Sequence, residues 1–398
     1  MNQHAASHNC RPHALFLAFF FLSLVTHVAA QSDTWSGSTS AIWTDSGNWV
    51  SGNLPGTGHT ATFLDGGNGN TTIDLSTGVA IGVIQFNAGA ASYTIGAGGV
   101  SAQNLTFDDG GDINLATGVA ANQTVAASVI LGDGTGNNSI ILDNDSSSEL
   151  LISGNITSGS GTAQQTLRAE GTGLIELAGI VTAGGSRLTL ESRGNLTISG
   201  NVVGTGNTQR TIVRNGGVLS TTATGLVGQG NLDLRHGTVN LNNTTNVQLF
   251  DDGIVLGDTT LGDGNATLNI GSGVTVELDS SITYQADDNT ANVASIIGGT
   301  IDLSLGTRFI NVADNALVDG SELILETDFK DTSDTTASAD LIITGSGTVT
   351  WGSTINTDSA TEKVDLLDFN TRKVVIAESG NEITGLRRNL RVRQRNSA

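Results

Sequence analysis

The hydrophobic residues of this chain alternate with polar ones in short runs that glycines and turn residues separate. In the segment 186–208, Leu188 and Leu190 alternate with polar residues, and after a glycine Leu196 and Ile198 do the same. Alternation with a period of two places the apolar side chains on one face of a β-strand. Glycine tolerates the positive φ angles that turns between strands often need. The pattern therefore predicts two short strands and a turn in each such unit.

Similar units repeat along the chain. They begin at Gln165, Ser186, Gln209 and Gly230, so the steps are 21, 23 and 21 residues. One unit of this size cannot bury its apolar face, whereas stacked copies bury a continuous core. The repeat predicts an all-β fold, a parallel β-helix (solenoid) of about 21–23-residue rungs. At roughly 4.8 Å between paired strands, about 13 rungs would form a rod of about 60 Å.

Alignment of the units predicts one column of inward side chains that consists of Ile152, Ile175 or Leu177, Ile198, Ser220 and Leu241. Ser220 is the polar member of this column. Either its hydroxyl bonds the backbone of a neighbouring rung, or the alignment is one residue out of register at this unit. A slip of one residue moves a side chain to the opposite face of its strand.

Residues 1–30 have the pattern of a cleaved secretory signal peptide. Arg11 precedes an apolar run from Ala14 to Val25, and the segment 28–30 supplies small residues for cleavage. The run is too short for an ordinary membrane span, so the mature chain is expected to have no transmembrane segment. Cys10 is the single cysteine. Cleavage would therefore leave a mature chain without disulfides.

Residues 31–65 differ from the rest of the chain because they contain Trp35, Trp43 and Trp49, three of its four tryptophans. A solenoid needs a terminal unit that covers the end of its core and blocks the open strand edges. We interpret 31–65 as a Trp-rich N-terminal cap. The alternative is a platform on which the indole rings stack against sugars.

The remaining chain divides into two parts. Residues 66–385 are assigned to the β-helix repeats, with the polar segment 330–340 as their most prominent loop. Residues 386–398 form a basic tail, which is expected to be disordered as chain ends usually are. The alternative is a contact with anionic lipopolysaccharide or with the acidic rod itself, made by the tail arginines Arg387, Arg388, Arg391, Arg393 and Arg395.

Two groups of motifs carry a family resemblance. The first is a W-x-x-x-x-N-W pattern with the residues that follow it, and the second comprises two later glycine-rich segments; they are Trp43–Trp49, Gly52, Pro55, Ala61–Phe63, 171–179 and 263–278. With these motifs the chain resembles secreted bacterial proteins with autotransporter-associated β-strand repeats, over most of residues 34–350. The resemblance implies a right-handed parallel β-helix at the surface of a Gram-negative bacterium, as in adhesin-like passenger domains.

The composition narrows the choice of partners. The formal net charge is −21 and the pI about 4.3, with only 14% charged residues and 53 glycines. An acidic surface argues against nucleic acids and anionic membranes as partners. It leaves extracellular polysaccharide, matrix or other cells as the expected partners, and permits loose binding of divalent cations.

Parallel β-helices also carry polysaccharide lyases and hydrolases, and an inverting hydrolase needs paired carboxylates roughly 6.5–9.5 Å apart. Fragments of the polygalacturonase pattern occur at 356–358, at Asp251 with Asp252, and at 235–237. Their order along the chain differs from that family, and acidic pairs arise by chance among 38 acids. A shared fold does not imply a shared function. We therefore expect no catalytic residues.

Metal and glycan motifs are weak as well. The segment Asp143–Asp145 begins like an EF-hand loop, but Ser148 stands where glycine is needed, so a solvated turn is expected. The repeated Leu-Gly-Asp-Gly segments, 131–134 and 261–264, lack the nine-residue calcium pattern. The histidines, including His59 and His236, have no second ligand at metal spacing, and Asn104, Asn155 and Asn195 are interpreted as turn asparagines rather than glycan sites.

These observations favour a secreted or cell-surface structural, adhesion-type β-helix that is not an enzyme and uses no metal or cofactor. The alternative is a polysaccharide-active enzyme on the same scaffold. It would require acidic, arginine and histidine side chains from adjacent rungs to converge on one face. The sequence alone names no ligand-binding residues.

Overall fold

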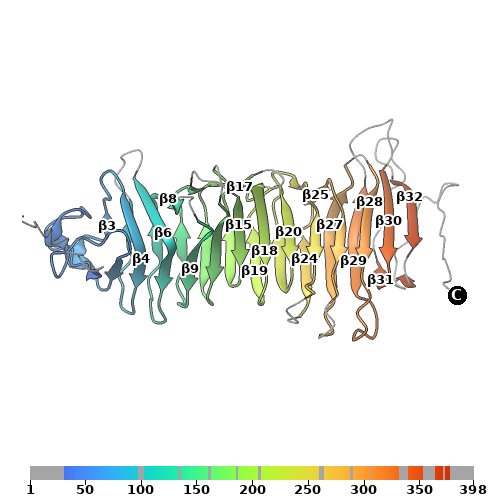
Figure 1. The fold of residues 1–398 in the computed structure, drawn as a ribbon, viewed down its shortest axis with the longest axis horizontal. Coiled ribbons are helices and arrows are strands. Elements are labelled where there is room, and N and C mark those ends of the chain that lie inside the picture. The colour runs from blue at the N-terminus through green and yellow to red at the C-terminus, as the bar shows by residue number, and fades with distance from the viewer. Residues whose placement is uncertain are drawn as a thin grey trace, which may run out of the picture.

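The computed structural model describes residues 31–96, 103–132, 136–159, 163–184, 187–204, 208–259, 264–286, 290–304, 306–330, 339–352, 364–370 and 373–376. These residues form a parallel β-solenoid, in which the rungs are stacked along the long axis of the molecule (Figure 1). The all-β fold and the parallel β-helix that the repeat predicts are confirmed.

One turn shows how the repeat builds a rung. β13 (Leu174–Leu177), β14 (Val181–Thr182) and β15 (Leu188–Ser192) follow one another around the turn. The next strand, β16 (Asn195–Ile198), pairs in parallel with β13 and so begins the next rung. A full turn thus has a first, a second and a third face.

The strands of the first face form one sheet of parallel ladders. Beside β13 and β16 it contains β3 (Thr72–Ile73), β5 (Thr94–Ile95), β7 (Gln123–Val125), β10 (Leu150–Ile152), β19 (Gly217–Thr221), β21 (Gly237–Leu241), β24 (Ala266–Ile270), β27 (Ala294–Asp302), β29 (Leu323–Lys330), β31 (Thr348–Trp351) and β33 (Lys373–Ile376). Two short strands, β22 (Gln248–Phe250) and β25 (Thr275–Leu278), join this sheet at β27.

The other sheet begins with β1 (Asp33–Thr34), β2 (Thr60–Phe63), β4 (Val79–Phe86) and β6 (Asn104–Leu115). After β6 it divides between two faces. The second face continues through β8 (Ser128–Leu131), β11 (Ile156–Ser158), β14 and β17 (Val202–Val203). The third face continues through β9 (Asn138–Asn144), β12 (Gln165–Glu170), β15, β18 (Gln209–Val213), β20 (Asn231–Leu234), β23 (Ile254–Leu256), β26 (Ile282–Tyr284), β28 (Arg308–Val312), β30 (Ala339–Gly345) and β32 (Val364–Asn370).

Most rungs are longer than the regular repeat. The step from Leu177 to its paired residue Ile198 equals the predicted repeat, whereas the step from Ile95 to its paired residue Val125 is clearly longer. The solenoid has about 11 turns of roughly 26 residues, so the rungs predicted from the sequence are too numerous and too short. Parallel pairing keeps the strands of successive rungs in register, whereas the number of residues between one paired segment and the next varies.

The core is the column of inward side chains that alternation predicts. Leu188, Leu190, Leu196 and Ile198 are all fully buried. Ser220 is an exception to the predicted column, because it pairs with Thr197 and points outward. The residue above Ile198 is the buried Thr221, so the predicted register was wrong by one residue at this unit.

The N-terminal end of the rod, which is coloured blue in Figure 1, contains three of the four tryptophans. Trp35, Trp43 and Trp49 are at most 3% exposed, and Trp49 packs edge-on against both other indoles with centroids 4.9 and 5.1 Å away. The alternative of a sugar platform fails because no ring presents its face to solvent. Two short 3-10 helices, η1 (Ser46–Asn48) and η2 (Gly67–Gly69), belong to the same end.

The N-terminal segment also covers the outer edge of the first strand. Strand β1 pairs with β2 on one side, and on its other side the Thr34 carbonyl accepts a 3.0 Å bond from the backbone N–H of Val50. An open parallel edge would otherwise expose unpaired backbone groups. Because β1 and β2 belong to the 18-stranded sheet, the predicted segment 31–65 contributes strands to the solenoid as well.

Glycines permit the close approach of successive corners. A Cβ atom at Gly179 would lie 2.0 Å from the carbonyl oxygen of Gly154 in the rung below, and one at Gly200 would lie 2.2 Å from the carbonyl oxygen of Gly179. The Cβ atoms of real proteins essentially never approach another heavy atom closer than 3.0 Å. The glycines of this corner are therefore required by spacing between rungs rather than by a positive φ.

Gly179→Ala is expected to destabilise the protein by about 2 kcal/mol, since the added methyl group forces two rungs apart. Thermal and denaturant unfolding, followed by circular dichroism, would measure this loss. Gly66→Ala is the matched control, because the nearest atom to its added Cβ would be 3.8 Å away, and it is expected to change stability by less than about 0.5 kcal/mol. Equal effects of the two substitutions would contradict the proposed role of the corner.

Candidate functional site

Several charged side chains lie at outward positions of the third face. We call the outward residues of two adjacent columns there the ionic face. The first column is Asp112, Ile141, Arg168, Glu191, Ile212 and Asp233, which are in register from β6 to β20. The second column, two residues further along each strand, is Asn114, Asp143, Glu170, Arg193, Arg214 and Arg235.

Glu191 is the centre of the ionic face. Its carboxylate accepts bonds from Nε of Arg168 at 3.0 Å, from Nε of Arg193 at 2.7 Å, and from Nε of Arg214. The Glu191 side chain is only 3% exposed. Burial raises the pKa of this carboxyl, but the hydrogen bonds from the three arginines outweigh that effect and lower the pKa below its ordinary value. Glu191 is therefore a buried carboxylate that three guanidinium groups hold in its ionised form.

A second group continues the network towards β23. Asp233 accepts bonds from Arg210 and from Arg235, the latter with Nη2 at 2.9 Å. Arg235 also contacts Asp258 through Nη1 at 3.2 Å. Asp233 is 3% exposed, as Glu191 is. The arginines thus tie neighbouring rungs together across their outward faces.

This network changes the charge along the rod. Residues 31–160 carry 11 acidic side chains and no lysine or arginine. Residues 161–235 carry six arginines and four acids, which is a net charge of +2. Residues 236–385 carry 23 acids and five lysines or arginines, which is a net charge of −18. A cationic band therefore lies between two strongly acidic parts of the sequence.

The acids at the N-terminal end of the ionic face have no such partners. Burial, and then the charges of Asp143 and Glu170, raise the pKa of Asp112 to about 6. Its Oδ1 atom is buried and accepts no hydrogen bond in the described part of the chain. Burial, and then the charges of Asp145 and Glu170, raise the pKa of Asp143. Neither carboxyl forms an ion pair with any arginine or lysine among the described residues.

Sequence reasoning named two members of this face for other reasons, Arg235 in the polygalacturonase-like fragment 235–237 and Asp143 in the EF-hand-like segment. The polygalacturonase-like neighbours of Arg235 lie elsewhere: Asp251 and Asp252 follow β22, whereas His236 lies at the corner between β20 and β21. The segment 356–358, which includes Asp358, lies outside the described residues. The signal that was missed is the spacing of the charges, since Glu170, Arg193, Arg214 and Arg235 follow one another at steps of 23, 21 and 21 residues.

The EF-hand-like segment is a structural corner. Asn144 is fully buried, and its Nδ2 donates to the carbonyl oxygens of Ser148 and Leu174, both at 2.8 Å. Its Oδ1 accepts bonds from the backbone N–H and the hydroxyl of Ser146. The expected solvated turn is therefore wrong for Asn144. Because the amide is fully used in these bonds, it has no oxygen left to bind calcium.

The other candidate ligands are used locally or are not described. His59 accepts a 2.9 Å bond from the backbone N–H of Gly56 through Nδ1. Asn155 and Asn195 both bond the backbone of a neighbouring rung. Asn155 lies between β10 and β11, whereas Asn104 and Asn195 begin strands β6 and β16, so the turn prediction is wrong for these two. The aspartates of the two Leu-Gly-Asp-Gly segments lie outside the described residues. Within the described ranges, no three His, Cys, Asp or Glu side chains are grouped closely enough to hold a metal ion.

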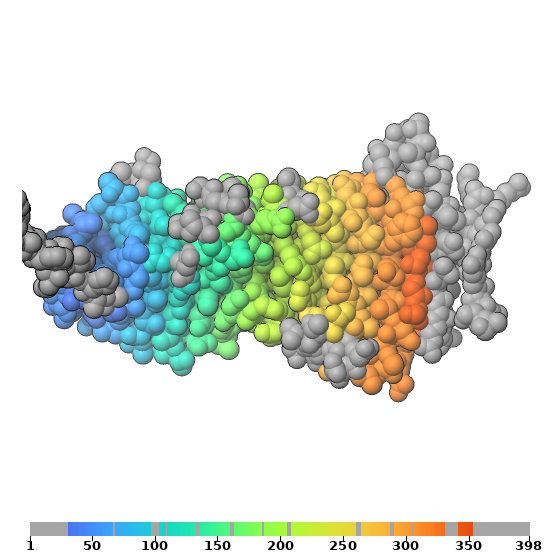
Figure 2. Space-filling model, in the orientation of Figure 1, coloured from blue at the N-terminus to red at the C-terminus, as the bar shows by residue number. Residues whose placement is uncertain are grey.

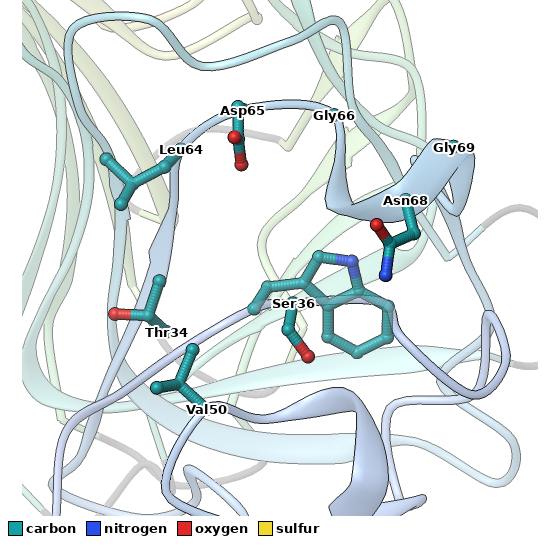
Figure 3. Close-up of a pocket in the computed structure, with 9 residues that line it drawn as sticks. Thr34, Ser36, Val50, Leu64, Asp65, Gly66, Asn68 and Gly69 are labelled. Atoms are coloured by element: carbon teal, nitrogen blue, oxygen red, sulfur yellow. The ribbon is translucent and has the colours of Figure 1, made fainter.

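A shallow depression of about 470 Å³ lies at the N-terminal end of the rod (Figure 3). Figure 3 shows Thr34, Val50, Leu64 and Asp65 along one side of the opening and Asn68 on the other. Val50 and Leu64 are exposed apolar side chains at 68% and 38%. The depression carries one carboxylate and no cation, so it differs in character from the ionic face.

Comparison of the chain with protein-family models, with curated proteins and with solved structures gives no match. Within the part of the chain that the structure describes, no helix has the length and hydrophobicity that a membrane span requires. The signal peptide (residues 1–30), the segment 331–338 and the basic tail (386–398) lie outside the described residues, so those assignments stay predictions.

Asp112→Asn is expected to stabilise the protein by about 1 kcal/mol at pH 8. The pKa of Asp112 is higher in the folded protein than in the unfolded chain, so its ionisation opposes folding as the pH rises from about 4 to about 6. The advantage of the variant should therefore vanish near pH 4. Thermal unfolding across this pH range measures it, with the exposed Asp252→Asn as control. A stability difference that does not depend on pH would contradict this account.

Proposed function

We propose that the chain is a secreted or cell-surface structural protein of the adhesion type, without catalytic activity. The observation that carries the proposal is the continuous stacking of strands from β1 to β33, with one buried apolar core inside the described rungs. Figure 2 shows the elongated outer surface of this rod. A rod of about 11 rungs is about 50 Å long at roughly 4.8 Å per rung. Such a rod presents three long faces and a series of corners to other molecules and serves as a rigid spacer.

The chemistry of the ionic face supports binding over catalysis. Three arginines hold Glu191 in its ionised form, and the carboxylates of Glu191 and Asp233 are both buried and ion-paired with guanidinium groups. A general acid needs a proton near neutral pH, and a nucleophile needs access to its substrate. Glu191 meets neither requirement, and Asp233 is too buried for a substrate to reach, so both carboxylates serve to hold the rungs together.

The proposed setting follows from the sequence. The apolar run and the small residues at 28–30 support export, and the resemblance to autotransporter-associated repeats supports the outer surface of a Gram-negative bacterium. The proposed partners are extracellular polysaccharide, matrix or other cells. A chain with a formal net charge of −21 suits neutral or cationic surfaces better than nucleic acid.

One observation favours the second candidate, a polysaccharide-active enzyme. Asp112 and Asp143 lie on adjacent rungs of one face, and both have raised pKa values. A carboxyl with a pKa of about 6 is suited to act as a general acid near neutral pH. This candidate would place catalysis at the N-terminal end of the ionic face, with Asp112 as the proton donor.

The two candidates differ in their action on polymers. The purified protein is incubated with neutral and acidic polysaccharides, with and without Ca²⁺, and reducing ends and unsaturated products are measured before insoluble polymer is sedimented. We expect sedimentation with at least one polymer and no product. Product that disappears in Asp112→Asn, but not in the control Asp252→Asn, would establish the enzyme instead.

The export proposal has a separate test. The mature protein is expected in the periplasmic, outer-membrane or extracellular fraction of a Gram-negative host, with Gln31 as its first residue. Fractionation followed by N-terminal sequencing measures both. A protein that stays in the cytoplasm with Met1 intact would contradict the signal peptide, whatever the polymer assay shows.

A further inference from the structure

The second column of the ionic face has an ordered charge pattern. Its first three members are the amide Asn114 and the acids Asp143 and Glu170, and its last three are arginines, namely Arg193, Arg214 and Arg235. The change of sign falls between β12 and β15. About this boundary, Glu170 is opposite in charge to Arg193 and Asp143 is opposite in charge to Arg214, whereas Asn114, the counterpart of Arg235, is neutral.

In the first column, too, residues at equal distances from the boundary between β12 and β15 match one another. Arg168 on β12 is followed by Glu191 on β15, and outside this pair stand Ile141 on β9 and Ile212 on β18. Counted outward from the boundary between β12 and β15, the first residues on either side, Arg168 and Glu191, are opposite in charge. The second residues, Ile141 and Ile212, are both apolar. The match ends with Asp112 and Asp233, which are both acidic, but Asp233 is already bonded to two arginines.

A two-fold rotation relates such a surface to a second copy of itself. Let this two-fold axis lie in the plane of the face, parallel to the strands, between β12 and β15. The second rod then lies on the ionic face of the first, and the long axes of the two rods run in opposite directions. The columns then stay aligned while the order of rungs reverses. Asp143 meets Arg214 of the second copy, Glu170 meets Arg193, and Ile141 meets Ile212. In an isologous contact of this kind every such pair occurs twice.

The groups brought together have unused bonding capacity in the single chain. Asp143 has no ion pair among the described residues. Arg214 bonds Glu191 through Nε, and its two terminal nitrogens form no other ion pair or hydrogen bond in the described part of the chain. Its side chain is 25% exposed, so the guanidinium group is accessible. The pairing would supply the missing partner of each.

We propose that two copies of this protein pair antiparallel through the ionic face, with Asp143 of each copy against Arg214 of the other. The proposal goes beyond the adhesive function, since it concerns contact between identical rods. Five spacings between rungs at roughly 4.8 Å and six residues at roughly 3.3 Å give about 1,000 Å² for both copies together. That area is typical of a weak, reversible contact, which salt would weaken further because it depends on exposed charges.

An anionic polysaccharide is the competing occupant of the arginines. It fits less well, because Asp143, Glu170 and the unpaired Asp112 would repel it at one end of the same face. A second copy satisfies both signs of charge. The experiment therefore includes heparin as a polyanion that would compete for the arginines alone.

The first test is charge reversal with rescue, measured by sedimentation velocity of the purified protein at low and high salt. Asp143→Arg and Arg214→Asp are each expected to weaken self-association roughly tenfold or more, since each places like charges opposite one another. An equimolar mixture of the two variants should restore it, because both contacts of the mixed pair are again opposite in sign. Lys330→Asp makes the same change of net charge as Arg214→Asp, on a distant rung, and should leave association unaltered.

The second test needs no charge change and guards against misfolding of Arg214→Asp. The mature chain has no native cysteine if the signal peptide is removed. A mixture of Ile141→Cys and Ile212→Cys should form a disulfide-linked pair on mild oxidation, whereas either variant alone should form far less. Circular dichroism confirms that each variant is folded.

Several outcomes would overturn the proposal. One is a parent protein that stays monomeric at low salt and at high concentration. Another is a folded pair of charge-reversal variants whose mixture does not associate, together with cysteine variants that do not cross-link. Binding of heparin that depends on Arg214 but not on Asp143, without self-association, would assign the face to a polyanion instead. None of these results bears on the polysaccharide assay or on export.

Discussion

The parallel pairing of each strand with the strands above and below is the constraint on which the whole molecule depends. It fixes the rise at roughly 4.8 Å per rung and places each side chain directly over its counterpart. Inside the solenoid this is favourable, because Leu188, Leu190 and their counterparts stack into one continuous apolar column. Outside, it means that the sequence of one rung determines which neighbours the next rung can tolerate.

The fixed spacing between rungs has its largest energetic effect on charged residues. Like charges stacked at the rung spacing repel, so a column of arginines is stable only if acids lie beside it. The structure places Glu191 and Asp233 there, each buried and each bonded to more than one arginine. The acids Asp112 and Asp143 have no arginine partner among the described residues, so burial and then the neighbouring acids raise their pKa values without compensation. The same rule thus explains the ordered half and the unsatisfied half of the ionic face.

Much of the fold could be predicted from the sequence, because the alternation and the regular steps between units report directly on strands and rungs. The rung count could not, since corner insertions such as the one between Ile95 and Val125 leave no periodic signal. The predicted position of Ser220 shows how a single slip reverses a residue. The ionic face could not be predicted from a sequence motif, because its members lie on different rungs and no short motif contains more than two of them. Only stacking the units in register reveals that Glu170, Arg193 and Arg214 form one column.

The distribution of tryptophans has a consequence for spectroscopy. Trp35, Trp43 and Trp49 are buried at the first rungs, and Trp351 stacks on Phe329 near the opposite end, with ring centroids 5.4 Å apart. The intervening rungs contain no tryptophan. Intrinsic fluorescence therefore reports on the two ends of the rod and not on its middle. Fraying of an end would change the emission before circular dichroism registers a loss of strands, so the two signals together distinguish end fraying from collapse of the entire solenoid.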